Sequence, residues 1–173
     1  FHLKWFEHLS AKLGVESPFR TPADLLFDYP ALLRPTPLSR PLDVLFINSA
    51  PCSGQFRAYL SGPGGAFNPE YFDPLIAALA ARHRVVTTAR NRAGVPCTLD
   101  YGLTCTGIGN LSLYAKLIVA VSTGPSWPTF NRWNAGVKRL MFLDTETLNL
   151  APNTCEKDSL AAAETWLKLE GWL

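Results

Sequence analysis

The chain has 173 residues, of which 47% are hydrophobic, and its formal net charge is +2. This length suffices for one compact domain with a well-formed core. Lys and Arg are few and scattered, which is not typical of a nucleic-acid-binding protein, and no apolar stretch is long enough to span a bilayer. We therefore expect no nucleic-acid partner and no transmembrane segment.

The four cysteines are widely spaced and include no C-x-x-C pair; they are Cys52, Cys97, Cys105 and Cys155. Such spacing indicates neither a zinc site nor a disulfide framework. We expect reduced thiols, no metal, no cofactor and a cytoplasmic location, with a disulfide as the alternative. No signal peptide is visible. Because the chain begins at Phe1, already inside an amphipathic pattern, we expect it to be a piece of a longer protein.

The first 41 residues are expected to form a helix and a connector. Apolar residues at helical spacing predict a helix over 1–13, which Gly14 ends. Six prolines between 17 and 41 then exclude a long helix or a central strand. We interpret this segment as an extended linker along a surface, with one helical turn near 23–27. A Rossmann-like nucleotide-binding domain is expected to follow over 42–173.

Apolar runs alternate with helical patterns in that second part of the chain. The expected strands are 44–48, 84–88, 103–106, 117–121 and 137–143. The expected helices are 69–83, 110–116, a helix that ends at Trp133, and 158–169. This alternation predicts an α/β fold with a mostly parallel sheet of about five strands and helices on both faces.

The most informative segment is the apolar strand 117–121 and the sequence that follows it, Ser122-Thr123-Gly124-Pro125-Ser126. In open α/β sheets, ligands bind beyond the carboxyl ends of strands, often at a helix N-terminus where free N–H groups attract phosphate. Gly124 would let the main chain approach a ligand, and Pro125 suits a first helical turn. The alternative is that Ser122 or Thr123 merely caps the helix.

Two other strand ends are expected at the same edge of the sheet. After the first strand come small and polar residues that could wrap a phosphate or form an ordinary polar turn: Asn48, Ser49, Ser53, Gly54 and Gln55. Gln55 or Arg57 would contact a negative group. This loop is neither G-x-G-x-x-G nor a Walker sequence. Thr88 and Arg90, after the second strand, are candidates for base or ribose contacts, although Arg90 and Arg92 are equally suited to a solvated loop.

Aromatic and acidic residues complete the set of candidates. Trp127 could stack on a base or sugar, or pack in the core as indoles commonly do, and the same choice holds for Trp133. Glu146 and Asp144 follow the fifth expected strand and could accept hydrogen bonds from sugar hydroxyls. No His/Asp/Ser constellation is visible, so no catalytic residue is assigned.

The strand that ends in Ser-Thr-Gly-Pro, with the short helix Asn110-Leu111-Ser112-Leu113-Tyr114-Ala115-Lys116 before it, resembles the C-terminal lobe of GT-B glycosyltransferases, especially the heptosyltransferase family. The opening residues 1–15 are similar to the helix that joins the family's two lobes. The resemblance implies that Thr123 and Gly124 approach the donor's diphosphate and that Ser49 and Ser53 lie in its phosphate loop. Ser122 stands where the family has an acid, and Trp127 where it usually has a histidine.

What the resemblance implies about function is a glycosyltransferase that binds a nucleotide-sugar donor. The acceptor, a glycan or another molecule, and the catalytic base would come from an N-terminal lobe outside this chain. Two alternatives stay open. One is a flavodoxin-like or TIR-like domain that binds a nucleotide or hydrolyses NAD, with Glu146 or Glu70 as its carboxylate. The other is a non-catalytic interaction domain.

Overall fold

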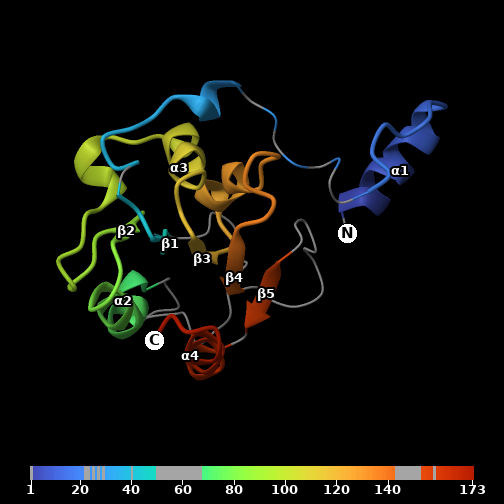
Figure 1. Ribbon diagram of the computed structural model, residues 1–173. Helices are drawn as coiled ribbons and strands as arrows, with labels where there is room; N and C mark the ends of the chain where they lie inside the picture. Colours follow the sequence, from blue (N-terminus) through green and yellow to red (C-terminus); the bar gives the residue numbers. More distant parts are fainter. Residues whose placement is uncertain are drawn as a thin grey trace.

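The computed structural model describes residues 2–21, 24, 26, 28, 30–39, 41–49, 68–142, 153–157 and 159–173, and Figure 1 traces the chain. Its centre is a single sheet of five parallel strands in the order β2-β1-β3-β4-β5. The strands are β1 (Val44–Ile47), β2 (Val85–Thr87), β3 (Leu117–Val121), β4 (Lys138–Phe142) and β5 (Thr154–Lys157). The predicted α/β class, with a parallel sheet and helices on both faces, is confirmed.

The central strands are apolar along their whole length, as expected for strands that are covered on both faces. Every residue of β1 and β3 is buried. In the parallel register Val44 lies opposite Leu117 and Ile47 lies opposite Ala120, so the two strands begin and end together. All five carboxyl ends therefore lie at one edge of the sheet and all five amino ends at the other.

One face of the sheet, here called the α2/α4 face, is covered by two regular helices (Figure 1). These are α2 (Asp73–Ala80), which continues the 3₁₀ turn η5 (Pro69–Phe72), and α4 (Leu160–Leu169). They bury apolar side chains against the strands; Phe72, Leu79 and Leu167 are all 0% exposed. Ser159 caps α4 by accepting from the Ala162 N–H at 3.3 Å.

The opposite face, here called the α3 face, is covered by shorter elements: α3 (Cys105–Leu111) and the 3₁₀ helices η7 (Gly124–Thr129) and η2 (Pro30–Leu33). They approach closely at Gly109. A Cβ there would lie 2.6 Å from Leu32 Cδ2 and 2.7 Å from Pro128 Cβ. Only a residue without a side chain fits between these two neighbours.

A buried arginine holds the turn between η7 and β4. Arg139 is 0% exposed, and its guanidinium donates to the carbonyl oxygens of Thr129 at 2.9 Å, Asn134 at 3.0 Å and Val137 at 2.7 Å. It also donates to Asn134 Oδ1 at 2.7 Å and lies 5.6 Å from the centroid of the Phe130 ring. Burial lowers the pKa of Arg139 to about 10, so the guanidinium stays charged at neutral pH.

The arginine is part of a larger polar network on the α3 face. Asn134 Nδ2 donates to Ser112 Oγ at 2.6 Å, and Asn131 Nδ2 donates to the same oxygen at 3.1 Å. Ser112 Oγ in turn donates to the Gly109 carbonyl at 2.6 Å. Side chains thus join the end of α3 to the loop before β4.

The proline-rich connector is more than a surface linker, which corrects the prediction. Leu32 is fully buried, and Asn110 of α3 holds the segment at two points. Its Nδ2 donates to the Leu32 carbonyl at 2.6 Å, and its Oδ1 accepts from Ser39 Oγ at 2.8 Å. The predicted turn at 23–27 lies largely outside the described residues, although Asp24 within it has 3₁₀ conformation; a further 3₁₀ turn is at Pro30–Leu33.

The N-terminal helix α1 (His2–Leu13) ends at Gly14 as predicted, because Gly14 takes a left-handed φ of 68° and Val15 N donates to the Ser10 carbonyl. Figure 1 shows α1 away from the sheet. Its exposed apolar side chains include Leu13, which is 67% exposed. The predicted division of the chain at residue 41 stays a prediction.

Several predicted elements are wrong in kind or position. The strand expected at 103–106 is absent, because Thr104 caps α3 by accepting from the Gly107 N–H and the helix begins at Cys105. That helix ends at Leu111, so the helix expected at 110–116 lies several residues too late. The helix expected to end at Trp133 is the short η7. The strand β5 was not predicted. The expected total of five strands matches the observed total only because one expected strand, 103–106, is absent and one observed strand, β5, was missed.

Candidate functional site

The carboxyl edge of the sheet has its topological switch point between β1 and β3. The chain proceeds from β1 to β2 on one side and returns to β3 on the other side of β1. Because Ile47 lies opposite Ala120, the residues that leave the two strands, Ser49 and Ser122, emerge side by side. A crevice at such a point is where open α/β sheets bind ligands.

On the β1 side, two predicted site residues hold the strand ends together. Asn48 is 0% exposed, and its Oδ1 accepts from the N–H groups of Thr88 at 3.2 Å and Ala89 at 2.7 Å. Thr88 Oγ1 in turn contacts Asn48 N at 3.1 Å and Ser49 Oγ at 2.7 Å. The side chains of Asn48 and Thr88 are thus occupied by the scaffold, whereas Ser49 is only half-buried.

On the β3 side, Ser126 organises the start of η7. Its Oγ accepts from Thr123 N at 3.1 Å and donates to the Thr123 carbonyl at 2.7 Å. The Ser126 hydroxyl therefore forms hydrogen bonds within the turn that begins η7, and we do not count it as a ligand contact. Thr123 is 3% exposed and is the N-cap of η7, in a capping-box arrangement in which its side chain faces the backbone of Ser126. This arrangement favours the interpretation that Thr123 caps the helix.

The backbone at Gly124 is open to solvent. Gly124 is exposed, and a Cβ on it would meet no atom within 4 Å. Its φ is not positive, so the turn itself does not require a glycine. The missing side chain instead leaves space above the strand ends, and Ser122 and Pro125 beside it are half-buried.

The arginines after β2 form ion pairs with their own neighbours. The exposed Arg90 Nη2 lies 3.2 Å from Asp100 Oδ1. Arg92 donates through Nη2 to Glu70 Oε2 at 2.6 Å, and its backbone N–H donates to Asp73 Oδ1 at 3.2 Å. Both arginines are more than 70% exposed, which favours the solvated-loop interpretation.

Trp127 packs against the α3-face core, with its ring centroid 6.4 Å from that of Phe130. This placement favours the core-packing interpretation over stacking on a base. Trp133 is 39% exposed. The remaining predicted candidates lie outside the described residues; they are Ser53, Gly54, Gln55, Arg57, Asp144 and Glu146.

The sequence interpretation missed the buried Arg139 and a pocket at the amino edge of the sheet, which is described below. The signal that could have marked Arg139 is its position directly before the apolar residues of a buried strand. Within the described residues, no group of three or more His, Cys, Asp or Glu side chains could hold a metal ion. Cys97, Cys105 and Cys155 are free thiols, and Cys52 lies outside the described residues.

Among the helices that the structure describes, none has the length and apolar character that a membrane crossing requires. Comparisons of the chain with protein families, with curated proteins and with solved structures find no significant match.

Proposed function

We propose that the chain is the donor-binding lobe of a glycosyltransferase and binds the diphosphate of a nucleotide sugar at the carboxyl ends of β1 and β3. The observation that carries the proposal is the switch point, where Ser49 and Ser122 lie side by side and Gly124 leaves open space.

The proposed chemistry is stabilisation of a leaving group. When the acceptor oxygen bonds to the anomeric carbon of the sugar, the bond from that carbon to the diphosphate oxygen breaks and negative charge develops on the diphosphate. Main-chain N–H groups and hydroxyls around Ser49 and Gly124 would stabilise this charge. Gln55 or Arg57 would add to it. The acceptor and the base would come from a second lobe, and we propose that α1 leads to that lobe, since Leu13 is exposed.

A short bridge beside β2 also supports the proposal that the chain binds a nucleotide. Cys97 pairs with Thr87 in an isolated parallel bridge on the outer side of β2. If that bridge is counted as a reduced strand, the order becomes 3-2-1-4-5-6, the arrangement of dinucleotide-binding sheets. The free thiols of the described cysteines agree with the proposed cytoplasmic location.

The order of the five full strands favours a second candidate, because 2-1-3-4-5 is the flavodoxin-like order. Under this alternative the same edge binds a nucleotide or hydrolyses NAD. Hydrolysis of NAD would need a carboxylate in the crevice, but Glu70 is engaged by Arg92 at the surface. Incubation with NAD and measurement of nicotinamide release distinguishes this activity from sugar transfer.

Isothermal titration calorimetry with nucleoside diphosphates and nucleotide sugars tests the main proposal. We expect at least one of them to bind, without efficient sugar transfer by this chain alone. Gly124→Leu should weaken binding at least tenfold, because its side chain would enter the open space. Ala161→Leu, at an exposed position of α4, is the control, since it introduces the same leucine side chain on a helix rather than in the loops after β1 and β3. No heat with any nucleotide, or equal effects of both variants, would refute the proposal.

A further inference from the structure

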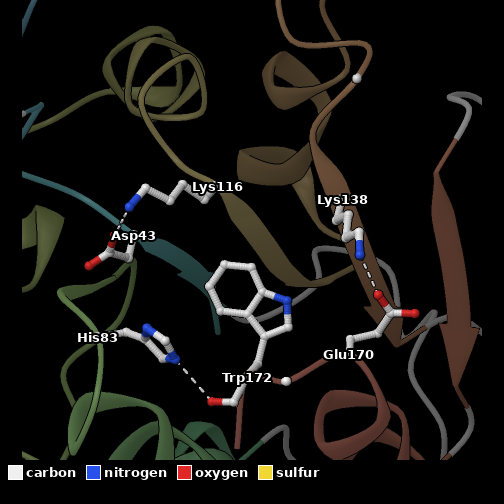
Figure 2. Close-up of a pocket in the computed structure, with 8 residues that line it drawn as sticks. Asp43, His83, Lys116, Lys138, Glu170 and Trp172 are labelled. Atoms are coloured by element: carbon white, nitrogen blue, oxygen red, sulfur yellow. Dashed lines mark hydrogen bonds and ion pairs between the residues drawn. The ribbon is translucent and has the colours of Figure 1, made fainter.

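The amino edge of the sheet, opposite the proposed donor site, contains a cavity of about 460 Å³ (Figure 2). Residues at the amino ends of β1, β3 and β4 line it together with the segment after α4. The charged and aromatic-ring side chains that line it are those of Asp43, His83, Lys116, Lys138, Glu170 and Trp172. The volume falls in the range of small-molecule sites.

The indole of Trp172 stands in the middle of this cavity, between two ion pairs (Figure 2). Its backbone is held in place from two sides. Gly171 ends α4 with a left-handed φ of 77°, which lets Trp172 N donate to the Leu167 carbonyl at 2.8 Å. The Trp172 carbonyl accepts from His83 Nε2 at 3.0 Å, and the two rings lie 5.0 Å apart. The indole also packs partly buried against the α2/α4-face core, so the part of its surface that lines the cavity is held in place.

The charges around the indole are arranged with the cations outermost. Lys116 Nζ lies 2.7 Å from Asp43 Oδ1, and Lys138 pairs with Glu170. The lysine side chains are 71% and 52% exposed, whereas Asp43 is 23% and Glu170 is 32% exposed. An ammonium has three N–H donors, so each pair leaves donors for a ligand.

Asp43 is further occupied by the protein itself. It also accepts from the Arg84 N–H at 3.0 Å. The hydrogen bond from Lys116, followed by that from Arg84, lowers the pKa of Asp43 below its usual value, so the carboxylate stays charged at neutral pH. The accessible charge of the cavity is therefore positive, although the two pairs sum to zero.

We propose that this cavity binds a small organic anion that carries an aromatic ring, such as an aromatic phosphate or carboxylate. The ring would lie against the Trp172 indole, and the anionic group would take the remaining donors of Lys116 or Lys138. A cationic aromatic ligand would also suit an indole face. The lysines disfavour it, because in both ion pairs the lysine side chain is more exposed than the carboxylate side chain.

This site is separate from the proposed donor site. β3 runs from Leu117 to Val121 between the two edges, and five residues of strand extend about 16 Å. A ligand at the amino edge would therefore contact the same strands as the donor without touching it. The inference does not depend on the proposed function.

NMR titration of the full chain tests the proposal with three probes: phenyl phosphate, inorganic phosphate and phenyltrimethylammonium. The readout is the indole N–H resonance of Trp172, assigned by its absence in Trp172→Phe. We expect a saturable shift with phenyl phosphate at millimolar concentrations, a weaker response to inorganic phosphate and little response to the cation. No shift, an equal response to the cation, or a response confined to Gly124 would overturn the proposal.

Substitutions of the two lysines provide the second arm. Lys116→Gln and Lys138→Gln should each raise the Kd for phenyl phosphate about two- to fivefold, as expected for exposed charge pairs. Lys12→Gln, on α1, is the matched control and should bind like the wild-type chain. Gly136→Leu should also weaken binding, because its side chain would enter the cavity. Wild-type affinity in both lysine variants would contradict the assignment.

Discussion

The two faces of the sheet are covered in different ways. In the described residues, the α2/α4 face is built from apolar side chains on two regular helices. The α3 face combines an apolar cluster with a buried polar network around Ser112, Asn131, Asn134 and Arg139. A regular helix covers a sheet with a stripe of apolar side chains. Short elements also need polar side chains that form hydrogen bonds with their unpaired backbone groups.

The physical reason lies in the backbone. A helix leaves its terminal N–H and C=O groups without partners, and these groups are a larger share of a short helix. On the α3 face, Arg139 donates hydrogen bonds to the carbonyls of Thr129, Asn134 and Val137. The first two of these bonds are buried, so without Arg139 their carbonyls would each lose a buried hydrogen bond. The faces should therefore respond differently to the same kind of substitution.

The largest effect is expected on the α2/α4 face, from Phe72→Ala. Phe72 is 0% exposed, and its ring centroid lies 5.5 Å from that of Phe46 and 5.0 Å from that of Phe142. Its removal should lower the free energy of unfolding by about 3–5 kcal/mol, measured by urea denaturation. Phe72→Leu keeps most of the volume and should cost about 1 kcal/mol. Equal losses in the two variants would contradict this account.

The next effect should come from Arg139→Met on the α3 face. Methionine would fill much of the volume but leave buried carbonyls without donors, at a cost of about 2–4 kcal/mol in the free energy of unfolding. Arg132→Met is the control, because Arg132 is 62% exposed and pairs with Asp28 at the surface. It should cost less than about 0.5 kcal/mol. If Arg139→Met stabilises the chain, the network is not what holds this face.

Gly109→Ala should have a smaller effect, about 1–3 kcal/mol, since the added Cβ would overlap Leu32 and Pro128. This loss outweighs the helix propensity that alanine gains over glycine. Gly107→Ala in the same helix is the control; its Cβ would meet only the Leu103 side chain, at 3.3 Å, which a shift of a few tenths of an ångström relieves, so the loss should be smaller. Thermal unfolding of the two variants measures the difference, and equal melting temperatures would contradict the proposed close contact.

The smallest effect is expected at the amino edge, which both faces share. The pKa of Asp43 is lowered in the folded state, so its carboxylate stabilises the fold above the unfolded value of about 3.9. This contribution is lost as the pH falls through the lower, folded pKa. Asp43→Asn should cost about 0.5–1 kcal/mol at pH 7. The difference from wild type, followed by urea denaturation, should shrink toward pH 3; a constant difference would contradict the linkage.

An element could be predicted from the sequence where its own residues carry the signal, and could not where distant contacts decide its structure. β1 and β3 are apolar runs and β4 ends in one, and the predicted bounds of all three lie within one residue of the observed ones. β5 has the sequence Thr-Cys-Glu-Lys, which carries no strand signal; it becomes a strand by pairing with β4 at the edge of the sheet. Conversely, 103–106 has strand-forming residues, but Thr104 caps a helix there.

The candidate site divides in a similar way. The residue types after 47 and 121 predicted polar loops at one edge, and the register brings Ser49 and Ser122 together there. Sequence alone did not reveal that the side chains of Asn48 and Thr88 would each accept a hydrogen bond from the backbone N–H of the other residue. For Trp127 the sequence offered both stacking on a ligand and core packing, and the structure favours core packing beside Phe130.

The sequence by itself determined the fold class, the buried central strands and the small, polar character of the loops that leave them, because apolar periodicity and turn chemistry are local properties. Tertiary structure alone decided the strand order, the recruitment of β5, the burial of Arg139 and the amino-edge cavity around Trp172. Each of these depends on contacts between residues far apart in the chain, which no local pattern records.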